Sequence, residues 1–268
     1  MDYTAILILA CIFIPLERLL PLHHDQPILR RDWANDLIYL LFNGFLVRAG
    51  SILVLGGVMA SWTHWVPAEA TAWTRSLPLW AQVIGVIVVA DIGYYTAHRL
   101  SHSIPFLWKF HSVHHSIEEM DWLASHRVHP FDQIWTNALS LLPVYFLGFS
   151  APAVAIFSVI YHVQALLLHS NLRITFGPLK WLIASPEYHH WHHADQREAY
   201  DRNFAAQLSL IDVVAGTMFL PRHRPERYGV SDPVPRSYPL QLLYPFAALL
   251  KARRKQTDTK GATHEQNA

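Results

Sequence analysis

The sequence predicts an all-α, polytopic membrane protein with about four transmembrane helices and a cytoplasmic, histidine-rich helical cap. Hydrophobic residues make up 52% of the 268 residues and charged residues only 15%, well below the roughly 25% of soluble domains. Several apolar runs approach the roughly 20 residues that cross a bilayer. A formal net charge of +1 argues against a nucleic-acid-binding protein. The single cysteine, Cys11, excludes a disulfide scaffold and a cysteine-based metal site.

The first three apolar runs are each predicted to form a helix. The run over 3–20 has an acidic start at Asp2 and lacks the basic flank and cleavage site of a signal peptide, so we expect a retained helix. The runs over 36–60 and 79–98 are long enough to cross the bilayer.

Two further apolar stretches follow. The stretch over 134–168 is interrupted by Gly148 and Pro152, which predicts a helical hairpin that spans the membrane or dips into it. The stretch over 240–250 is too short to cross and is expected to lie on the membrane or to pack on the protein. The polar residues after it are expected to be disordered.

The distribution of basic residues predicts the orientation. Most cations lie beside the histidines, whereas Arg75 is the only basic residue among positions 60–78. Because cytoplasmic loops carry the excess of Lys and Arg, we expect the histidines on the cytoplasmic side and the tryptophan-rich loop from Trp62 to Trp80 on the other. The cations counted with the histidines include Arg30, Arg31, Arg99, Lys109 and Arg127.

Histidine is the most unusual component of the chain. Thirteen of the 18 histidines fall between His98 and His193, and eight of these form three clusters at spacings of three or four residues. Such spacings place side chains on one helix face. The eight are His98 and His102; His111, His114 and His115; and His189, His192 and His193.

The clusters predict a site for two metal ions. A transition metal needs several ligands at about 2.0–2.2 Å, and one helix supplies several imidazoles only at one-turn separations. Eight imidazoles exceed what one four- to six-coordinate ion uses. Packing alone is a poor explanation, because buried polar rings must each find a partner.

The other histidines are weaker candidates. His190 is expected next to the metal ligands or at the surface. His126 and His162 are expected either to contact the metal ligands or to lie apart from them. The isolated histidines are expected at the surface: His23, His24, His64, His223 and His264.

Other metal-site and catalytic motifs are missing from the sequence. Di-iron bundle proteins use two Glu-x-x-His motifs with further carboxylates, but only one such spacing exists, from Glu187 to His190. There is no zinc-protease motif and no nucleophile elbow. An all-imidazole site is therefore favoured.

These residues resemble the fatty acid hydroxylase/sterol desaturase superfamily of membrane-bound, histidine-rich dimetal oxygenases. The segment 91–102, followed by 111–115 and 189–193, carries the resemblance. Segment 124–132 is similar to the sterol C5-desaturase branch, and 168–171 to that branch and to the alkylglycerol monooxygenases.

The resemblance covers about half of the chain and implies a division into three segments. It implies N-terminal transmembrane helices over 1–90, a catalytic domain over 91–220, and a C-terminal membrane-surface segment with a polar tail over 221–268. The chain departs from the family near the end of the catalytic domain. Where relatives often carry Asn-Tyr-Gly, it has Asn203-Phe-Ala205, which affects local packing and substrate fit more than metal binding.

The resemblance implies an oxygenase that hydroxylates or desaturates a lipid with O2 and two iron ions, with zinc as another metal that the purified protein can hold. The lipid would be a sterol or hopanoid, a fatty acyl chain or an ether lipid. The eight clustered histidines would be its catalytic metal ligands. His169 and His129 are added as further ligands, because the residues around them match the family.

An external electron donor is also expected, since the sequence has no flavin, nicotinamide, haem or cysteine-cluster motif. It would be a reductase, a ferredoxin or a cytochrome that docks on the cytoplasmic face. The cations at Arg222, Arg224, Arg227 and 251–255 are one place to receive it, although anionic lipid is the more common partner of such cations.

Asp91 lies on the same predicted helix face as Tyr95 and His98. A carboxylate there needs a partner in lipid. We expect it to bond either Tyr95 or a ligand imidazole, or to pair with Arg48.

One alternative belongs to another class: a polytopic metal transporter, or a metal-binding protein without oxygenase activity. A carrier should place ionisable residues through the bilayer midplane. Here the histidines gather toward one end of the segments, which favours the oxygenase.

Overall fold

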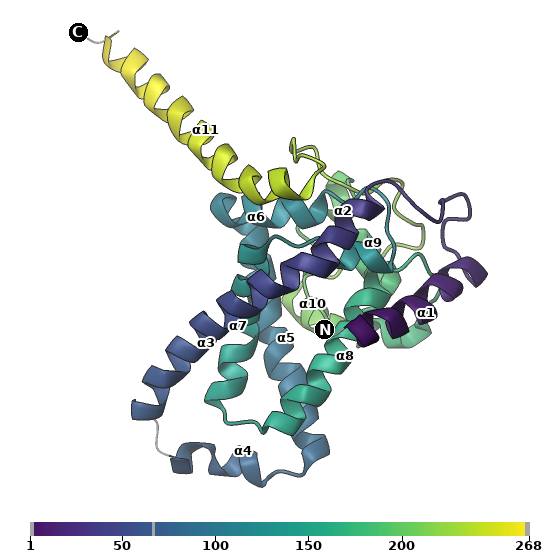
Figure 1. Ribbon diagram of the computed structural model, residues 1–268, viewed down its shortest axis with the longest axis vertical. Coiled ribbons are helices and arrows are strands. Elements are labelled where there is room, and N and C mark those ends of the chain that lie inside the picture. The colour runs from purple at the N-terminus through teal and green to yellow at the C-terminus, as the bar shows by residue number, and fades with distance from the viewer. Residues whose placement is uncertain (1–2, 66–67, 266–268) are drawn as a thin grey trace.

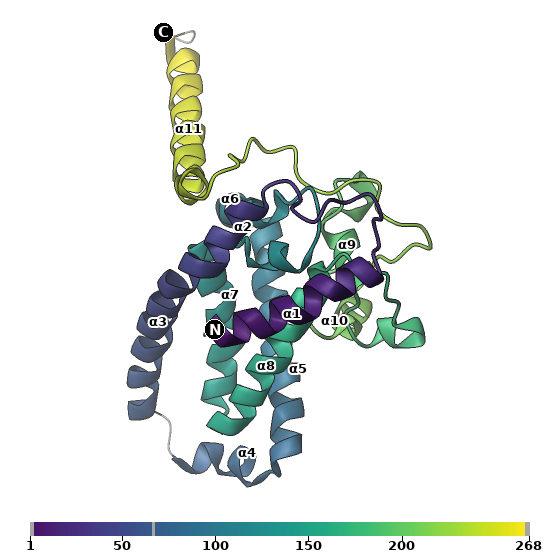
Figure 2. The same ribbon diagram turned by 45° about the vertical axis from the view of Figure 1, so that its right-hand side comes forward.

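The computed structural model describes residues 3–65 and 68–265, and these residues form helices and connecting loops with no β-strand. Figures 1 and 2 show α3 (Gly44–Trp65), α5 (Leu79–Ser103), α7 (Pro130–Phe146) and α8 (Ala151–His169) running along the long axis of the body. The short α4 (Ala72–Ser76) lies at one end of this bundle. Two helices that carry histidines, α6 (Pro105–His115) and α9 (Pro186–His192), lie toward the other end.

The remaining elements surround this bundle. They are α1 (Tyr3–Leu19), α2 (Trp33–Ile38), the π-helix η1 (Tyr39–Asn43), the 3-10 helices η2 (Ala68–Thr71), η3 (Trp122–His126), η4 (Gly177–Trp181) and η5 (Arg197–Ala199), and the helices α10 (Ser209–Ala215) and α11 (Tyr238–Glu265).

Three helical stretches are long and apolar enough to cross a membrane: Trp33–Trp62, Leu79–Ser103 and Ala151–His169. The all-α membrane fold is thereby confirmed, while the number of four spans stays a prediction. The expected hairpin is formed by α7 and α8, and Gly148 turns the chain between them with φ +75°. Glycine adopts this left-handed conformation without the steric penalty of a side chain.

Close backbone contact fixes α7 against α5. A Cβ atom on Gly93 would lie 2.2 Å from the carbonyl oxygen of Leu139, so only glycine allows this approach. The hydroxyl of Ser140 donates to the carbonyl of Ala90 at 2.9 Å. These contacts fix the position of α7 against the helix that carries His98.

Helix α1 packs onto the histidine-bearing end of the bundle. Its Phe13 belongs to a buried cluster with Trp122 and Leu166. The carboxyl group of Glu17 accepts the backbone N–H groups of Trp122 and Asn171 at 2.8 and 2.9 Å. The N-terminal helix is thus tied to the segments that follow α6 and α8.

A buried ion-pair network joins the N-terminal part of the chain to the loop after α6. Asp36 accepts from Arg30 and from Arg127, each at 2.5 Å, and Arg30 also reaches Asp121 at 2.7 Å. Two of the cations counted for the orientation are therefore buried and paired. A third, Lys109, pairs with Asp232 at 2.6 Å. The cytoplasmic placement of the cap stays a prediction.

The C-terminal segment differs from its expected form. The apolar stretch and the polar residues after it form one continuous helix, α11, as far as Glu265. Its first part packs on α6, where Phe246 contacts Phe110, and its second part leaves the body (Figure 1).

Candidate metal centre

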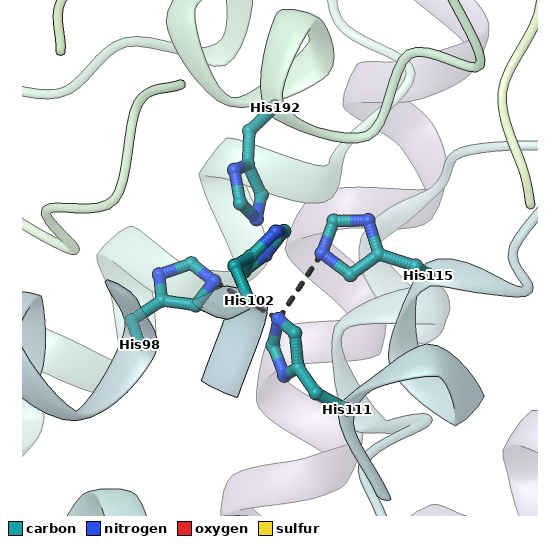
Figure 3. A group of neighbouring side chains, drawn as sticks. All are labelled: His98, His102, His111, His115 and His192. Atoms are coloured by element: carbon teal, nitrogen blue, oxygen red, sulfur yellow. Dashed lines mark hydrogen bonds between the residues drawn. The ribbon is translucent and has the colours of Figure 1, made fainter. Parts of the chain in front are cut away.

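Five imidazoles converge at the junction of α5, α6 and α9. Their ring nitrogens lie within 4.8 Å of one another, and Figure 3 shows the rings pointing toward a common centre. Four of the five residues are buried and His102 is half-buried. We call this set the five-imidazole group: His98, His102, His111, His115 and His192.

Four further imidazoles converge beside it. Their ring nitrogens also lie within 4.8 Å of one another, and all four residues are buried. We call this set the four-imidazole group: His114, His169, His189 and His193. It contains His169, which ends α8, together with residues of α6 and α9.

Helix geometry explains how each cluster is divided. Residues four apart share a helix face, so His111 and His115 enter one group and His189 and His193 enter the other. The remaining histidine of each cluster belongs to the opposite group: His114 joins the four-imidazole group, and His192 joins the five-imidazole group. Both α6 and α9 thus contribute to both groups.

Five of the imidazoles are oriented by a hydrogen bond from Nδ1, the ring nitrogen that faces away from the centre of its group. The Nδ1–H of His98 donates to the carbonyl of Phe204 at 2.7 Å, and that of His114 to the carbonyl of Arg127 at 2.9 Å. His111 donates to the carboxylate of Asp132 at 2.8 Å. Two more bonds to carbonyls follow the pattern: His169 to Ala165 and His192 to Arg202, each at 2.8 Å.

These bonds leave Nε2 as a lone-pair donor directed into each group. The Nε2 atoms of His98 and His111 lie 3.0 Å apart, a contact dashed in Figure 3, and those of His114 and His169 lie 3.2 Å apart. With both protons on Nδ1, neither contact has a hydrogen to share. The lone pairs then need a cation between them, which is the arrangement of metal ligands.

Unpartnered nitrogens point to the same chemistry. The Nε2 atoms of His102 and His192 are buried and have no hydrogen-bond partner among the described residues. A buried polar atom without a partner costs free energy. A metal ion in the five-imidazole group would satisfy both atoms. The facing Nε2 lone pairs of His114 and His169 need a second cation in the four-imidazole group, so the donor set fits two transition-metal ions.

Burial also keeps these rings in the form that binds metal. Burial lowers the pKa of His114 to about 4 and holds the pKa of His189 and His193 well below the ordinary 6.5. At neutral pH the imidazoles are therefore uncharged, as metal ligands must be.

Asp91 has none of its three expected partners among its hydrogen bonds. Its carboxylate accepts three backbone N–H groups, from Ala206, Gln207 and Leu208, at 2.6–3.1 Å. Tyr95 instead bonds Thr217 at 3.1 Å. Backbone donors satisfy the buried charge because the loop after α9 folds over the end of the carboxylate.

That loop, residues 203–208, supports the five-imidazole group. Asp212 accepts the backbone N–H groups of Phe204 and Ala205 at 2.8 and 2.9 Å. Asn203 has φ +61°, and its amide donates to the carbonyls of Tyr188 and Phe219. Phe204 packs edge-on against His98. Phe204, which stands where the resembled family often carries tyrosine, thus lies against an imidazole of the five-imidazole group.

Sequence reasoning missed Asp132 and Asp201, which both face ligand imidazoles. Asp132 is buried, and Asp201 lies 3.4 Å from His102 at the surface. The one signal for Asp132 is a carboxylate in the first turn of an otherwise apolar helix. Asp201 has φ +56°, a conformation that no spacing pattern reveals.

His129 lies outside both groups. Its Nδ1 accepts the backbone N–H of Phe131 at 3.1 Å, which caps α7, and its Nε2–H donates to the carbonyl of Leu242 at 3.2 Å. Both ring nitrogens are therefore engaged away from the other imidazoles.

The remaining histidines also lie outside the groups. His190 is buried and bonds Ser170 and Tyr228, and His23 bonds the same tyrosine, so His23 is half-buried rather than exposed. His162 is exposed on α8. His126 is half-buried, with an Nε2 that has no partner in the described part of the chain. His24 and His223 are exposed as expected; the side chains of His64 and His264 lie outside the described residues.

Two cavities reach the imidazoles from different sides. A small one, of about 30 Å³, lies between α5 and α8 beside Tyr94 and Tyr161 and touches both groups. A larger one, of about 260 Å³, touches only the five-imidazole group and is lined by polar residues that include Asp201 and Asp232.

The chain is similar to known proteins across the segment that carries the nine imidazoles. The profile of the fatty acid hydroxylase family matches residues 83–217. The chain is similar to an ornithine lipid hydroxylase from Rhizobium tropici, with 30% identity over 86% of this chain and 71% of that protein. It is 28% identical to an alkylglycerol monooxygenase from Xenopus tropicalis over 81% of this chain, and it spans about half of that relative (48%). No solved structure shows significant similarity to the chain.

Proposed function

Because this chain belongs to the fatty acid hydroxylase family, we propose that it is a membrane-bound oxygenase that hydroxylates or desaturates a lipid at a centre of two iron ions. One observation carries the proposal: nine imidazoles converge in two adjoining groups, beside the ends of apolar helices. The alternative of a metal transporter is not favoured, because the imidazoles gather at one end of the helices rather than along a path through them.

The five-imidazole and four-imidazole groups would each hold one ion. Two bound iron ions would supply the activation of O2 that the oxidation of an unactivated C–H bond requires. The chain orients five of the nine imidazoles through their Nδ1 bonds and buries eight of the nine residues away from bulk water. We leave His129 out of the proposed ligand set because both of its nitrogens have protein partners.

The small cavity between α5 and α8 is the proposed place of the reacting carbon. It is bordered by Tyr94, Tyr161 and Leu168 and meets imidazoles of both groups. The aromatic and aliphatic side chains among its lining residues suit a lipid. The names of the relatives favour an amino-acid-containing lipid or an ether lipid as the substrate.

Electrons would come from a separate donor of the reductase, ferredoxin or cytochrome type, docking on the cytoplasmic side. Reporters fused after Arg75 and after Lys180 test that side, and we expect opposite readouts. Matching readouts would overturn the orientation.

The function itself is tested by lipid mass spectrometry of cells that express the wild-type chain or its His114→Ala variant. The wild type should produce lipids that have gained one oxygen or lost two hydrogens, and the variant should not. Purified wild-type protein should contain about two metal ions, and its iron-loaded form should be the active one. Identical lipids in both cell lines, despite equal expression, would refute the proposal.

A further inference from the structure

A separate cavity of about 270 Å³ lies beside α9 and touches none of the nine converging histidines. Its walls come from the loop after α8, from η4 and α9, and from the segment 221–225. The oxygenase chemistry does not use it.

The walls of this cavity are strongly basic. Four cations line it against one carboxylate, Glu187, which gives a net charge of three positive. We call them the four basic residues: Arg173, Lys180, Arg222 and Arg224. Such a concave set of like charges is unfavourable by itself and attracts an anion.

The basic side chains are available for a ligand. In the described part of the chain, Arg173 and Arg222 have no ion-pair partner and are exposed. Lys180 lies 3.9 Å from Glu187, at the outer limit of an ion pair, and Arg224 donates only to the carbonyl of Leu22 at 3.3 Å. Guanidinium groups present paired N–H donors that match phosphate oxygens.

Large apolar side chains that lie close in the sequence to the lining residues Leu22 and Lys180 are exposed. Leu19 at the end of α1 is 75% exposed, and Leu179 and Trp181 of η4 are 57% and 50% exposed. Exposed leucine and tryptophan beside arginine and lysine are typical of residues at the boundary between acyl chains and headgroups.

From these two features we propose that the cavity binds the phosphate group of an anionic phospholipid, whose acyl chains lie against the apolar residues of η4 and α1. A free phosphate would use the same cations but would make no use of the exposed apolar side chains of η4 and α1. An acidic carrier protein would need a protruding or flat basic surface, whereas these cations line a hollow.

The test is native mass spectrometry of the full-length, metal-loaded protein in detergent. The protein is titrated with dihexanoyl phosphatidylglycerol, with dihexanoyl phosphatidylcholine and with inorganic phosphate. We expect one phosphatidylglycerol to bind more tightly than either of the others. The R173A/R222A double variant should weaken that binding about tenfold, while R75A, which removes an exposed arginine at the far end of the bundle, should leave it unchanged.

Metal content serves as the measure of folding, and it should be equal in all three proteins. Equal phosphatidylglycerol affinity in wild type and R173A/R222A would overturn the proposal. Equally tight binding of inorganic phosphate would assign the cavity to the free ion instead. Unchanged lipid binding with a loss of carrier-supported turnover in the double variant would assign it to a protein partner. The binding measurements with phosphatidylglycerol, phosphatidylcholine and inorganic phosphate do not depend on whether the metal centre oxidises lipid; only the turnover readout does.

Discussion

The carboxylate of Asp91 accepts the backbone N–H of Leu208 at 2.6 Å, and this contact ties α5 to the loop that supports its own His98. Four residues before Leu208, the carbonyl of Phe204 accepts the Nδ1–H of His98 at 2.7 Å. Asp91 and His98 lie two turns apart on one helix, so the loop bridges them. A buried charge is satisfied by backbone groups, and the same backbone orients a proposed ligand.

Replacing Asp91 by asparagine should loosen this bridge. An amide keeps one acceptor oxygen but directs an NH2 group at a backbone N–H, so at least one buried donor loses its partner. We expect a loss of about 1–3 kcal/mol in the free energy of unfolding and a lower metal content. Denaturant unfolding in detergent and elemental analysis measure both. Asp25→Asn, at an exposed site, should change neither, and a wild-type stability in Asp91→Asn would contradict the bridge.

Asp132 should matter for metal binding more than for the fold. Its carboxylate accepts the Nδ1–H of His111 and so keeps Nε2 directed at the five-imidazole group. Removal of such a partner lowers metal affinity about 10–100-fold. Asp132→Ala should show this loss in chelator competition, and Asp132→Asn, whose Oδ1 still accepts, should show a smaller one. Equal losses in the two variants would mean that the hydrogen bond does not orient the ligand.

The two groups should respond differently to the loss of one ligand. His193→Ala leaves three imidazoles in the four-imidazole group, and we expect metal content to fall from about two ions to about one. His102→Ala leaves four in the other group, so it should keep both ions while losing activity. His162→Ala, on the exposed face of α8, is the matched control. A similar metal loss in all three variants would argue against two separate sites.

The histidine spacings predicted the convergence of the clusters but not how they divide. Residues four apart stay together because one helix face fixes them, as His98 and His102 do. His114 and His192 each join the group opposite to that of their helix neighbours. This depends on the angle between α6 and α9, which a local sequence pattern does not predict. His169 was added because the residues around it resemble the family, and its ring lies in the four-imidazole group; that it binds a metal stays a prediction.

Partners that come from the backbone could not be predicted. All three expected partners of Asp91 were side chains, whereas the actual ones are backbone amide groups more than a hundred residues away. The capping role of His129 was not predicted, because the sequence does not show which atom accepts the backbone N–H of Phe131. Arg127 was counted as a free cation, since its buried partner Asp36 lies far away in the sequence.

The buried ion pairs of Asp36 should contribute much more to the free energy of unfolding than ion pairs at the surface. Asp36→Ala would leave Arg30 and Arg127 buried without their shared carboxylate, which costs about 3–5 kcal/mol in the free energy of unfolding. Because the carbonyl of Arg127 accepts from His114, the variant should also retain less metal. Arg31→Ala removes an exposed pair with Glu118 and should cost less than about 1 kcal/mol. Comparable losses in the two variants would contradict the structural role of Asp36.

Acid should destabilise the protein and release its metal over one pH range. Burial lowers the pKa of His114 from 6.5 to about 4 and depresses the pKa of His189 and His193 as well. The unfolded chain takes up protons on these rings below about pH 6.5, whereas the folded chain resists them until about pH 4. Stability is therefore complete above pH 6.5 and is lost as the pH falls through that window. Metal binding should also weaken as the pH falls, because protons compete with the metal for the same nitrogens.

Unfolding midpoints and metal content, measured across this range in detergent, should decline together. In the variant His114→Asn one of these rings is gone, so its stability should depend less steeply on pH than that of the wild type. A stability that stays level or rises as the pH falls from 6.5 to 4 would show that these imidazoles are not held neutral by burial.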